Sequence, residues 1–231
     1  MNYFINYASG GFFKSQELGL KSAESFGFRV KGYTEKDISE EFKLKNERIF
    51  ESQRGAGFWI WKPYIILDML KQINEDDYLI YMDSGANLIG DPVGYLDIID
   101  SKGILAFSMM QKTSKWTKGD CFFVINKNNK SDFKDYNQLQ GTYIFFRKCD
   151  YSISFVQKWL DLCTTKNLID DSPNIHMDNF EDFIEHRHDQ AIFSLLSYNE
   201  NIMNVPQIDQ YCVEHGLSIE RKIVNRHGIR L

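Results

Sequence analysis

A short, continuously apolar segment that ends abruptly in polar residues limits the possible folds more than any other feature. Residues 78–82 read Tyr-Leu-Ile-Tyr-Met, and Asp83-Ser84-Gly85 follows at once. A strand with one wet face would alternate apolar and polar residues, whereas a strand without alternation is buried on both faces by covering helices. The sequence therefore predicts an α/β fold in which residues 78–82 form a central strand with Asp83 at its carboxyl end.

The N-terminal part of the chain predicts a β-α-β opening. Residues 2–7 are apolar and end at Ala8-Ser9-Gly10-Gly11, residues 12–26 carry apolar side chains near helical spacing, and residues 28–33 again resemble a strand. The loop after the first strand of such a unit lies at the sheet edge where open α/β sheets bind ligands. Asn6 and Tyr7 are therefore candidates for contacting a nucleotide, although an ordinary turn fits the pattern equally well.

The remaining elements extend the same organisation. Periodicity predicts surface helices within residues 35–52, helices over residues 63–73, 150–163 and 188–196, a helix start at residues 117–120, strands over residues 104–109 and 142–147, and a loop with a short helix over residues 170–185. No repeat or low-complexity linker interrupts them. We expect a single domain over residues 1–231, with a mixed, mostly parallel sheet flanked by helices.

Composition narrows the functional classes. The 231 residues include 43% hydrophobic residues and carry a net charge of −5, which favours a large core and argues against a general nucleic-acid binder. The chain has neither a signal-peptide pattern nor an apolar run approaching membrane-spanning length, so we expect a cytoplasmic protein, with peripheral membrane contact left open. The cysteines form no Cys-x-x-Cys pair, which predicts reduced, mostly buried thiols.

Arg54 and Lys62 flank a loop rich in glycine and tryptophan that leads into a helix with Pro63 in its first turn. A helix N-terminus beside two cations suits a phosphate, and Trp59 and Trp61 are suited to wall a sugar or a base. Alternatively, both tryptophans belong to the core and both cations extend to solvent.

Four further places in the sequence carry side chains suited to chemistry. Asp83 is placed to hold a divalent cation against a diphosphate, with a turn aspartate as an equally good reading. Asp189-Gln190 precede the apolar run of a helix, where they either approach a substrate or only begin the helix. His186 and His188 are a weak metal pair. His227 in the tail is a candidate to close over a site, although a lone histidine near a terminus is more often a surface residue.

Together these segments resemble the GT-A glycosyltransferases, particularly the retaining group that contains glycogenin and the bacterial lipooligosaccharide galactosyltransferases. Lys62 and residues 78–85 are similar to the basic helix start and the strand that ends in the Asp-x-Asp motif, and Asp189-Gln190 is similar to the later Asp-Gln pair. Residues 139–144 are similar to the family's short turn and following strand, and Trp159 is similar to the tryptophan of the amphipathic helix after it. The string Arg-Gly-x-Gly-Phe-Trp-x-Trp-Lys-Pro, residues 54–63, resembles polysaccharide glycosyltransferases of bacteria and large viruses.

The resemblance implies a nucleoside diphosphate sugar donor bound by Asn6, Tyr7, Arg54, Lys62 and Asp83. It also implies a divalent cation, Mn²⁺ by preference, on Asp83 and His227. Asp189 and Gln190 would lie at the reacting sugar. A glycan or glycoconjugate would accept the sugar, in polysaccharide assembly.

Two departures from the family pattern affect these expectations. Gly85 stands where the motif has its second aspartate, which removes one expected metal ligand, and Gln140-Gly141 replaces the usual Asn-Ala turn. Asn87, Asp189 or His227 are candidates to complete a metal shell. A nucleotidyltransferase and a non-catalytic glycan-binding protein remain as alternatives.

Overall fold

The computed structural model describes residues 1–126, 133–208 and 224–226. Its centre is a seven-stranded sheet in the order β2-β1-β3-β7-β5-β6, with β8 paired to β5. Five strands, β1, β2, β3, β5 and β8, run in one direction, and β6 and β7 run in the other. The expected mixed, mostly parallel sheet flanked by helices is confirmed. The strands are β1 (Asn2–Ala8), β2 (Arg29–Thr34), β3 (Tyr78–Met82), β5 (Ile104–Lys112), β6 (Asn137–Leu139), β7 (Tyr143–Arg147) and β8 (Met203–Pro206).

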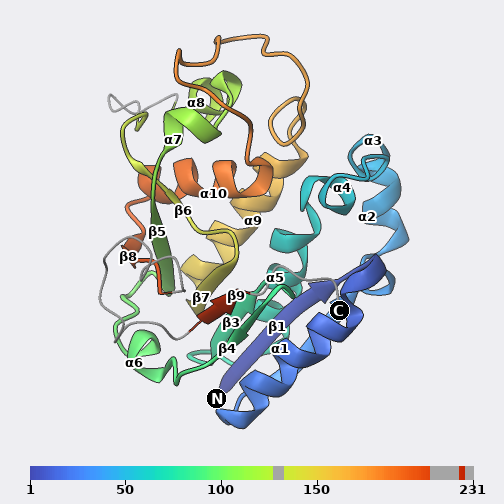
Figure 1. Cartoon of the computed structure of the whole chain (residues 1–231), viewed down its shortest axis with the longest axis vertical. Helices are drawn as coiled ribbons and strands as arrows, with labels where there is room; N and C mark the ends of the chain where they lie inside the picture. The colour runs from blue at the N-terminus through green and yellow to red at the C-terminus, as the bar shows by residue number, and fades with distance from the viewer. Residues whose placement is uncertain (127–132, 209–223, 227–231) are drawn as a thin grey trace.

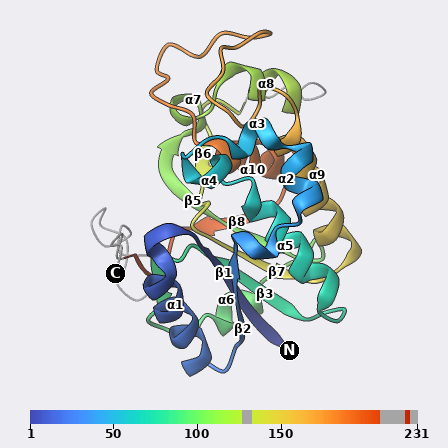
Figure 2. The same cartoon turned by 90° about the vertical axis from the view of Figure 1, so that its right-hand side faces the viewer.

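Helices cover both faces of this sheet (Figures 1 and 2). One face carries α1 (Phe13–Ser25) and α6 (Val93–Leu96), and the other carries α5 (Trp61–Gln72), α9 (Asp150–Thr164) and α10 (His188–Asn199). Shorter helices lie in the connections: η1 (Gly10–Phe12), η2 (Glu35–Asp37), α2 (Glu40–Lys45), α3 (Glu47–Phe50), α4 (Gly55–Phe58), α7 (Thr113–Trp116) and α8 (Gly119–Ile125).

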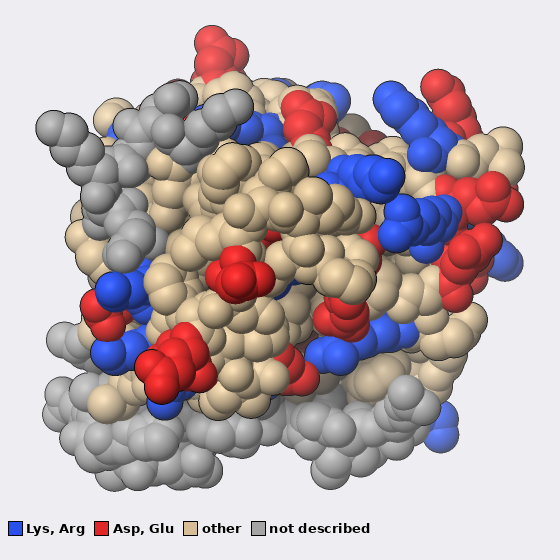
Figure 3. All heavy atoms as spheres, turned by 90° about the horizontal axis from the view of Figure 1, so that it is seen from above, with Lys and Arg blue, Asp and Glu red and all other residues tan. Residues whose placement is uncertain are grey.

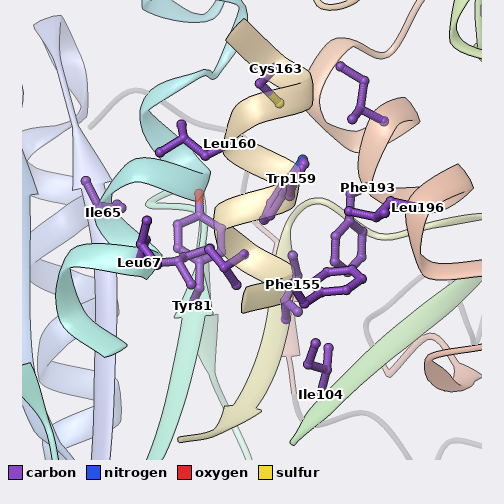
Figure 4. Packing of buried hydrophobic residues seen from close by; sticks show 14 of the residues in the cluster. Ile65, Leu67, Tyr81, Ile104, Phe155, Trp159, Leu160, Cys163, Phe193 and Leu196 are labelled. Carbon is purple, nitrogen blue, oxygen red and sulfur yellow. The ribbon is translucent and has the colours of Figure 1, made fainter. Parts of the chain in front are cut away.

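The packing of β3 explains its unbroken apolar sequence. Leu79 and Tyr81 face the cluster formed with α5, α9 and α10, whereas Ile80 and Met82 face the cluster formed with α1. Because both faces of β3 are buried, every position along it needs an apolar side chain. Figure 4 shows Tyr81 among side chains of α5 and α9, with Trp159 at the centre of that layer.

A second, two-stranded sheet lies beside the carboxyl end of β3. Here β4 (Ala86–Leu88) pairs antiparallel with β9 (Val224–Arg226), with Ala86 opposite Arg226. The backbone of the C-terminal segment therefore reaches a point three residues beyond Asp83. The pairing of these short strands places residues 224–226 beside the loop that follows β3.

The long periodic elements match their predictions closely, and the differences are confined to short ones. β4, β6, β8 and β9 are only three or four residues long, too short to show a period, and none was predicted. The short helix expected within residues 170–185 is absent, because that segment is held by side chains instead of a helical ladder. Cys121 and Cys163 are buried and unpaired, as expected, whereas Cys149 is half-buried and Cys212 lies outside the described residues.

In the described part of the chain, no helix combines the length and the apolar character needed to cross a membrane.

Candidate active site

The loops after β1 and β3 meet at one edge of the sheet. The two strands are parallel neighbours, with Ile5 opposite Tyr81, so both end on the same side. η1 follows β1, and Asp83 follows β3, where its backbone N–H donates a 2.7 Å hydrogen bond to the carbonyl of Thr142. The backbone of Asp83 is thus fixed to the turn before β7.

Two adjoining cavities open at this edge. The larger cavity, of about 740 Å³, is lined by Tyr7, residues 9–12, Trp61 and residues 83–85 among others. The smaller cavity, of about 490 Å³, is lined by Lys62, residues 140–142 and residues 187–190 among others. Asp83 and Trp59 line both, so the cavities meet at these two residues.

An aromatic stack forms one wall of the larger cavity. The rings of Tyr7 and Trp61 are 3.9 Å apart and nearly parallel, and both side chains are buried. Burial, reinforced by the carboxylates of Glu35 and Asp37, raises the pKa of Tyr7 to about 12, so its hydroxyl stays protonated at neutral pH. Tyr7 and Trp61, which the sequence singled out as candidates, therefore both lie in the wall of this cavity.

Asn6 lies on the opposite side of β1. Its side chain is fully buried and donates a 3.1 Å hydrogen bond to the carbonyl of Gln16 in α1, and Asn6 lines neither cavity. Successive residues of a strand point to opposite faces, which explains why Tyr7 reaches the cavity and Asn6 does not.

The loop between the cavities is a left-handed turn. All five residues from Gly55 to Trp59 have φ between +50° and +93°, a conformation that costs roughly 1–2 kcal/mol for each residue other than glycine. A Cβ atom at Gly55 would lie 2.3 Å from the Trp59 indole, so only glycine allows Trp59 to pack there. Strain of this kind is tolerated where the surroundings hold a residue in a required position.

Lys62 is the central charge of the smaller cavity. Its side chain is only 3% exposed, and Nζ lies 3.0 Å from Asp189 Oδ2 and 3.5 Å from Asp83 Oδ1. It also donates a 2.8 Å hydrogen bond to the carbonyl of Gly141. Burial alone would lower the pKa of Lys62, but Asp189 and Asp83 together raise it above its ordinary value, so the ammonium is charged. Lys62 does not extend to solvent; it joins two carboxylates.

Asp189 is buried beneath Lys62 at the start of α10. Burial raises its pKa to about 6, although Lys62 acts in the opposite direction. The contact with Lys62 is an ion pair of poor hydrogen-bond alignment, since Oδ2 has no aligned donor among the described residues. At neutral pH Asp189 is therefore an ionised but weakly solvated carboxylate.

Gln190 is held against the turn before β7. Its Oε1 accepts a 3.1 Å hydrogen bond from the backbone N–H of Gly141, and its Nε2 donates to Gln138 Oε1 at 3.2 Å. A Cβ atom at Gly141 would lie 3.2 Å from Lys62 Nζ and 3.1 Å from Gln190. The glycine of the Gln140-Gly141 turn thus makes room for both side chains.

The other predicted polar residues take different places. Arg54 lines the smaller cavity and pairs with Glu185 at 3.2 Å and Asp171 at 3.7 Å. The rings of His186 and His188 contact the backbone carbonyls of Leu168 and Ile169, respectively, so they do not converge on a metal. His227 lies outside the described residues.

The side chains around Asp83 provide a limited test of metal binding. Asp83 is 34% exposed and lines both cavities, so one carboxylate oxygen is available to a cation held by a ligand there. Its Oδ1 already accepts a hydrogen bond from the Tyr81 hydroxyl and lies near Lys62. Across the described ranges, no three His, Cys, Asp or Glu side chains gather as a metal site. Asp83 therefore fits one position of a cation site that a bound ligand would have to complete.

Sequence reasoning missed the residues that hold these groups in place. Tyr81 and Gln138 contact Asp83 and Gln190, yet Tyr81 is indistinguishable from its apolar neighbours and Gln138 lies in an unpredicted strand. The only available signal was the polar Gln140-Gly141 turn before β7.

Seen from above, Lys/Arg and Asp/Glu side chains are interspersed on the surface, without a basic face on that side (Figure 3).

Comparison with known proteins gives one kind of match. No family model matches the sequence, and no curated protein matches it. Solved structures do match. The chain is similar over 97% of its length to 93% of a glycosyltransferase involved in the glycosylation of the major capsid of PBCV-1, with a TM-score of 0.51 and 10% identity.

Two further matches are of the same kind. The galactosyltransferase LgtC, in complex with donor and acceptor sugar analogues, matches over 98% of this chain and 87% of its own, with a TM-score of 0.53 and 11% identity. The glycosyltransferase GlyE of Streptococcus pneumoniae matches over 98% of this chain and 54% of its own, with a TM-score of 0.51 and 12% identity. The expected likeness to GT-A glycosyltransferases is confirmed at the level of the fold.

Proposed function

We propose that this protein transfers a glycosyl group from a nucleoside diphosphate sugar to a hydroxyl of a glycan or glycoconjugate. The observation that carries the proposal is the junction of two cavities at Asp83, one at the ends of β1 and β3 and the other enclosing the buried carboxylate of Asp189. A donor of this class has two unlike halves joined by a diphosphate, and the two cavities offer two unlike environments. The glycosyltransferase fold supports the same reading.

The larger cavity suits the nucleoside. It adjoins the loop after β1, where open α/β sheets bind nucleotides, and the stacked rings of Tyr7 and Trp61 offer an aromatic wall to a base. In this arrangement the diphosphate crosses the junction at Asp83 and Trp59. Arg54 lies on the side of the smaller cavity, where it contributes positive charge near the phosphates.

The smaller cavity suits the sugar and the reaction. The bond between the anomeric carbon and the diphosphate oxygen breaks, and its electron pair leaves with the diphosphate. The acceptor oxygen bonds to the carbon, and its proton passes to the departing diphosphate oxygen. Asp189 supplies a preformed negative charge for the positive centre that develops, and Lys62 offsets the charge of the leaving group through its position beside Asp83. Gln190 orients the sugar, and the resemblance of Asp189-Gln190 to the Asp-Gln pair of retaining glycosyltransferases favours retention of configuration.

A divalent cation, with Mn²⁺ preferred, belongs to the proposal. It would be held by Asp83 together with oxygens of the donor diphosphate, because a cation can be bound by one or two carboxylates when phosphates supply the other ligands. Bound there, it would supply positive charge to the leaving diphosphate. The binding must be reciprocal: the nucleoside diphosphate tightens Mn²⁺ binding, and Mn²⁺ tightens nucleotide binding. Asp83→Ala should abolish this coupling in titration calorimetry, and full nucleotide affinity in EDTA would contradict it.

Polysaccharide or glycoconjugate assembly in the cytoplasm completes the proposed role, and peripheral membrane contact stays open. The test is donor hydrolysis by the purified protein with a panel of UDP- and GDP-linked hexoses, preceded by thermal shift with and without Mn²⁺. We expect release of free sugar and nucleoside diphosphate. Release of a nucleoside monophosphate would indicate a nucleotidyltransferase. Glycan binding without any turnover would indicate a non-catalytic protein.

A further inference from the structure

The wall of the smaller cavity carries hydrogen-bond acceptors that lack donors. Gln140 Oε1 and His188 Nε2 are buried and have no hydrogen-bond partner among the described residues, and Asp189 Oδ2 has only its ion pair with Lys62. All three residues line this cavity. An unpaired buried polar atom costs roughly 1–3 kcal/mol. Two such atoms in one wall, beside the Asp189 carboxylate, indicate that a ligand supplies the missing donors.

The chemistry of His188 is determined by its other ring nitrogen. Nδ1 lies 2.7 Å from the carbonyl oxygen of Ile169, which can only accept, so Nδ1 carries the proton. Burial lowers the pKa of His188, and in the neutral ring Nε2 is then a bare acceptor. Asp171 Oδ1 lies 3.9 Å from Nε2, and an ionised carboxylate is also an acceptor. No described neighbour satisfies this nitrogen.

The position of His188 is maintained against strain. Its φ is +48°, unusual for a residue other than glycine, and its side chain is 1% exposed. The ring lies 4.8 Å from that of Phe58 and stacks at 5.6 Å on Trp59, which is shared by both cavities. A left-handed residue at the first position of α10 therefore fixes an imidazole in the cavity wall, immediately before Asp189.

We infer that His188 is a specificity-determining residue of the smaller cavity: its Nε2 accepts a hydrogen bond from a hydroxyl of the bound sugar. This inference rests on the proposed function and deepens it, because a wall of acceptors selects sugars that keep their hydroxyl donors over deoxy sugars. The contact requires a small displacement of the ring or of the Trp59 indole, since Nε2 is buried without ligand. Sites built to bond a hydroxyl reject analogues that lack it, because the buried partner is left unpaired.

The experiment compares the binding of substrate analogues to the wild-type protein and to a variant. Dissociation constants are measured by calorimetry for UDP-glucose, UDP-galactose and GDP-mannose, and for analogues in which single sugar hydroxyls are replaced by hydrogen or fluorine. His188→Phe keeps an aromatic ring between Phe58 and Trp59 and removes the acceptor. His186→Phe is the matched control, because His186 is equally buried, does not line the cavity and has its Nε2 at 2.8 Å from the Leu168 carbonyl.

For wild type, we expect about tenfold weaker binding when one particular hydroxyl is replaced by hydrogen or fluorine, since neither can donate. His188→Phe should weaken binding of the parent nucleotide sugar by a similar factor. It should weaken binding of that one analogue by less than about twofold. If His188→Phe does not fold, His188→Gln, which keeps an acceptor at a similar reach, should retain the wild-type preference.

The outcomes separate the two proposals. If His188→Phe weakens binding of the parent sugar and of every analogue by the same factor, His188 does not have the proposed role. The same selective pattern in His186→Phe would also overturn it. An absence of binding of any nucleotide sugar to wild type would instead overturn the proposed function.

Discussion

The two cavities are built from the sequence in different ways. The larger cavity draws most of its wall from two stretches, the loop after β1 and residues 50–61, and its main interaction is an aromatic stack. The smaller cavity joins residues from six separate segments around one buried ammonium, with Lys62 paired to Asp83 and Asp189. A cavity made of local segments depends on shape, whereas one made of converging charges depends on each charge. Substitutions should therefore have larger effects in the smaller cavity.

The largest effect is expected at Asp189. Asp189→Asn keeps the shape and removes the charge that faces the reacting carbon, so kcat should fall roughly 10²–10³-fold, the usual loss for one preorganised electrostatic contact. Nucleotide binding in the larger cavity should change little. The check is steady-state turnover alongside calorimetric titration of the nucleoside diphosphate; a kcat within threefold of wild type would remove Asp189 from the reaction.

The contrast between the cavities also shows what the sequence could predict. Residues 78–82 and the β-α-β opening identify strand ends, and strand ends determine where ligands bind, so Tyr7 and Asp83 could be assigned to the site edge in advance. The ion pairs of Lys62 could not, because they depend on tertiary contacts that bring Lys62 of α5 beside Asp189 of α10 and the turn at Gly141. The sequence indicates a cation at a helix start, and its partners are set by tertiary contacts.

Lys62 should have the largest effect on stability. Lys62→Met leaves Asp189 buried without its counter-charge, which should destabilise the fold by roughly 3–5 kcal/mol in denaturant titrations at neutral pH. The pKa of Asp189, already raised by burial, should rise further. A carboxyl with a raised pKa in the folded state loses stability as pH rises through that pKa, so the variant should regain stability below about pH 6.

A double variant separates charge from packing at this position. Lys62→Met combined with Asp189→Asn removes both charges and should recover most of the lost stability, because no uncompensated carboxylate remains at that position. If the double variant is as unstable as Lys62→Met alone, the loss comes from packing, and the ion pair contributes little.

The pH dependence of turnover is the next effect in size. Since the pKa of Asp189 is about 6, kcat/KM should fall about tenfold for each pH unit below that value and level off above it. A diphosphate esterified at both ends does not titrate in this range, so the donor contributes no inflection. Asp189→Asn should lose the inflection, and an unchanged profile in that variant would assign it to another group.

The smallest effect is expected in the larger cavity, at the stack of Tyr7 on Trp61. An aromatic pair contributes roughly 0.5–1.5 kcal/mol beyond its buried area, so Tyr7→Leu should weaken nucleotide binding by about two- to tenfold. Tyr7→Phe is the matched control, since it keeps the ring and removes only the hydroxyl, and it should bind the nucleotide nearly as wild type does. Neither substitution should move the pH profile, because Tyr7 is not among the groups that shift the pKa of Asp189. A large loss of kcat in Tyr7→Leu at saturating donor would mean that the two cavities are energetically coupled through Trp59 and Asp83, and that shape in one determines charge alignment in the other.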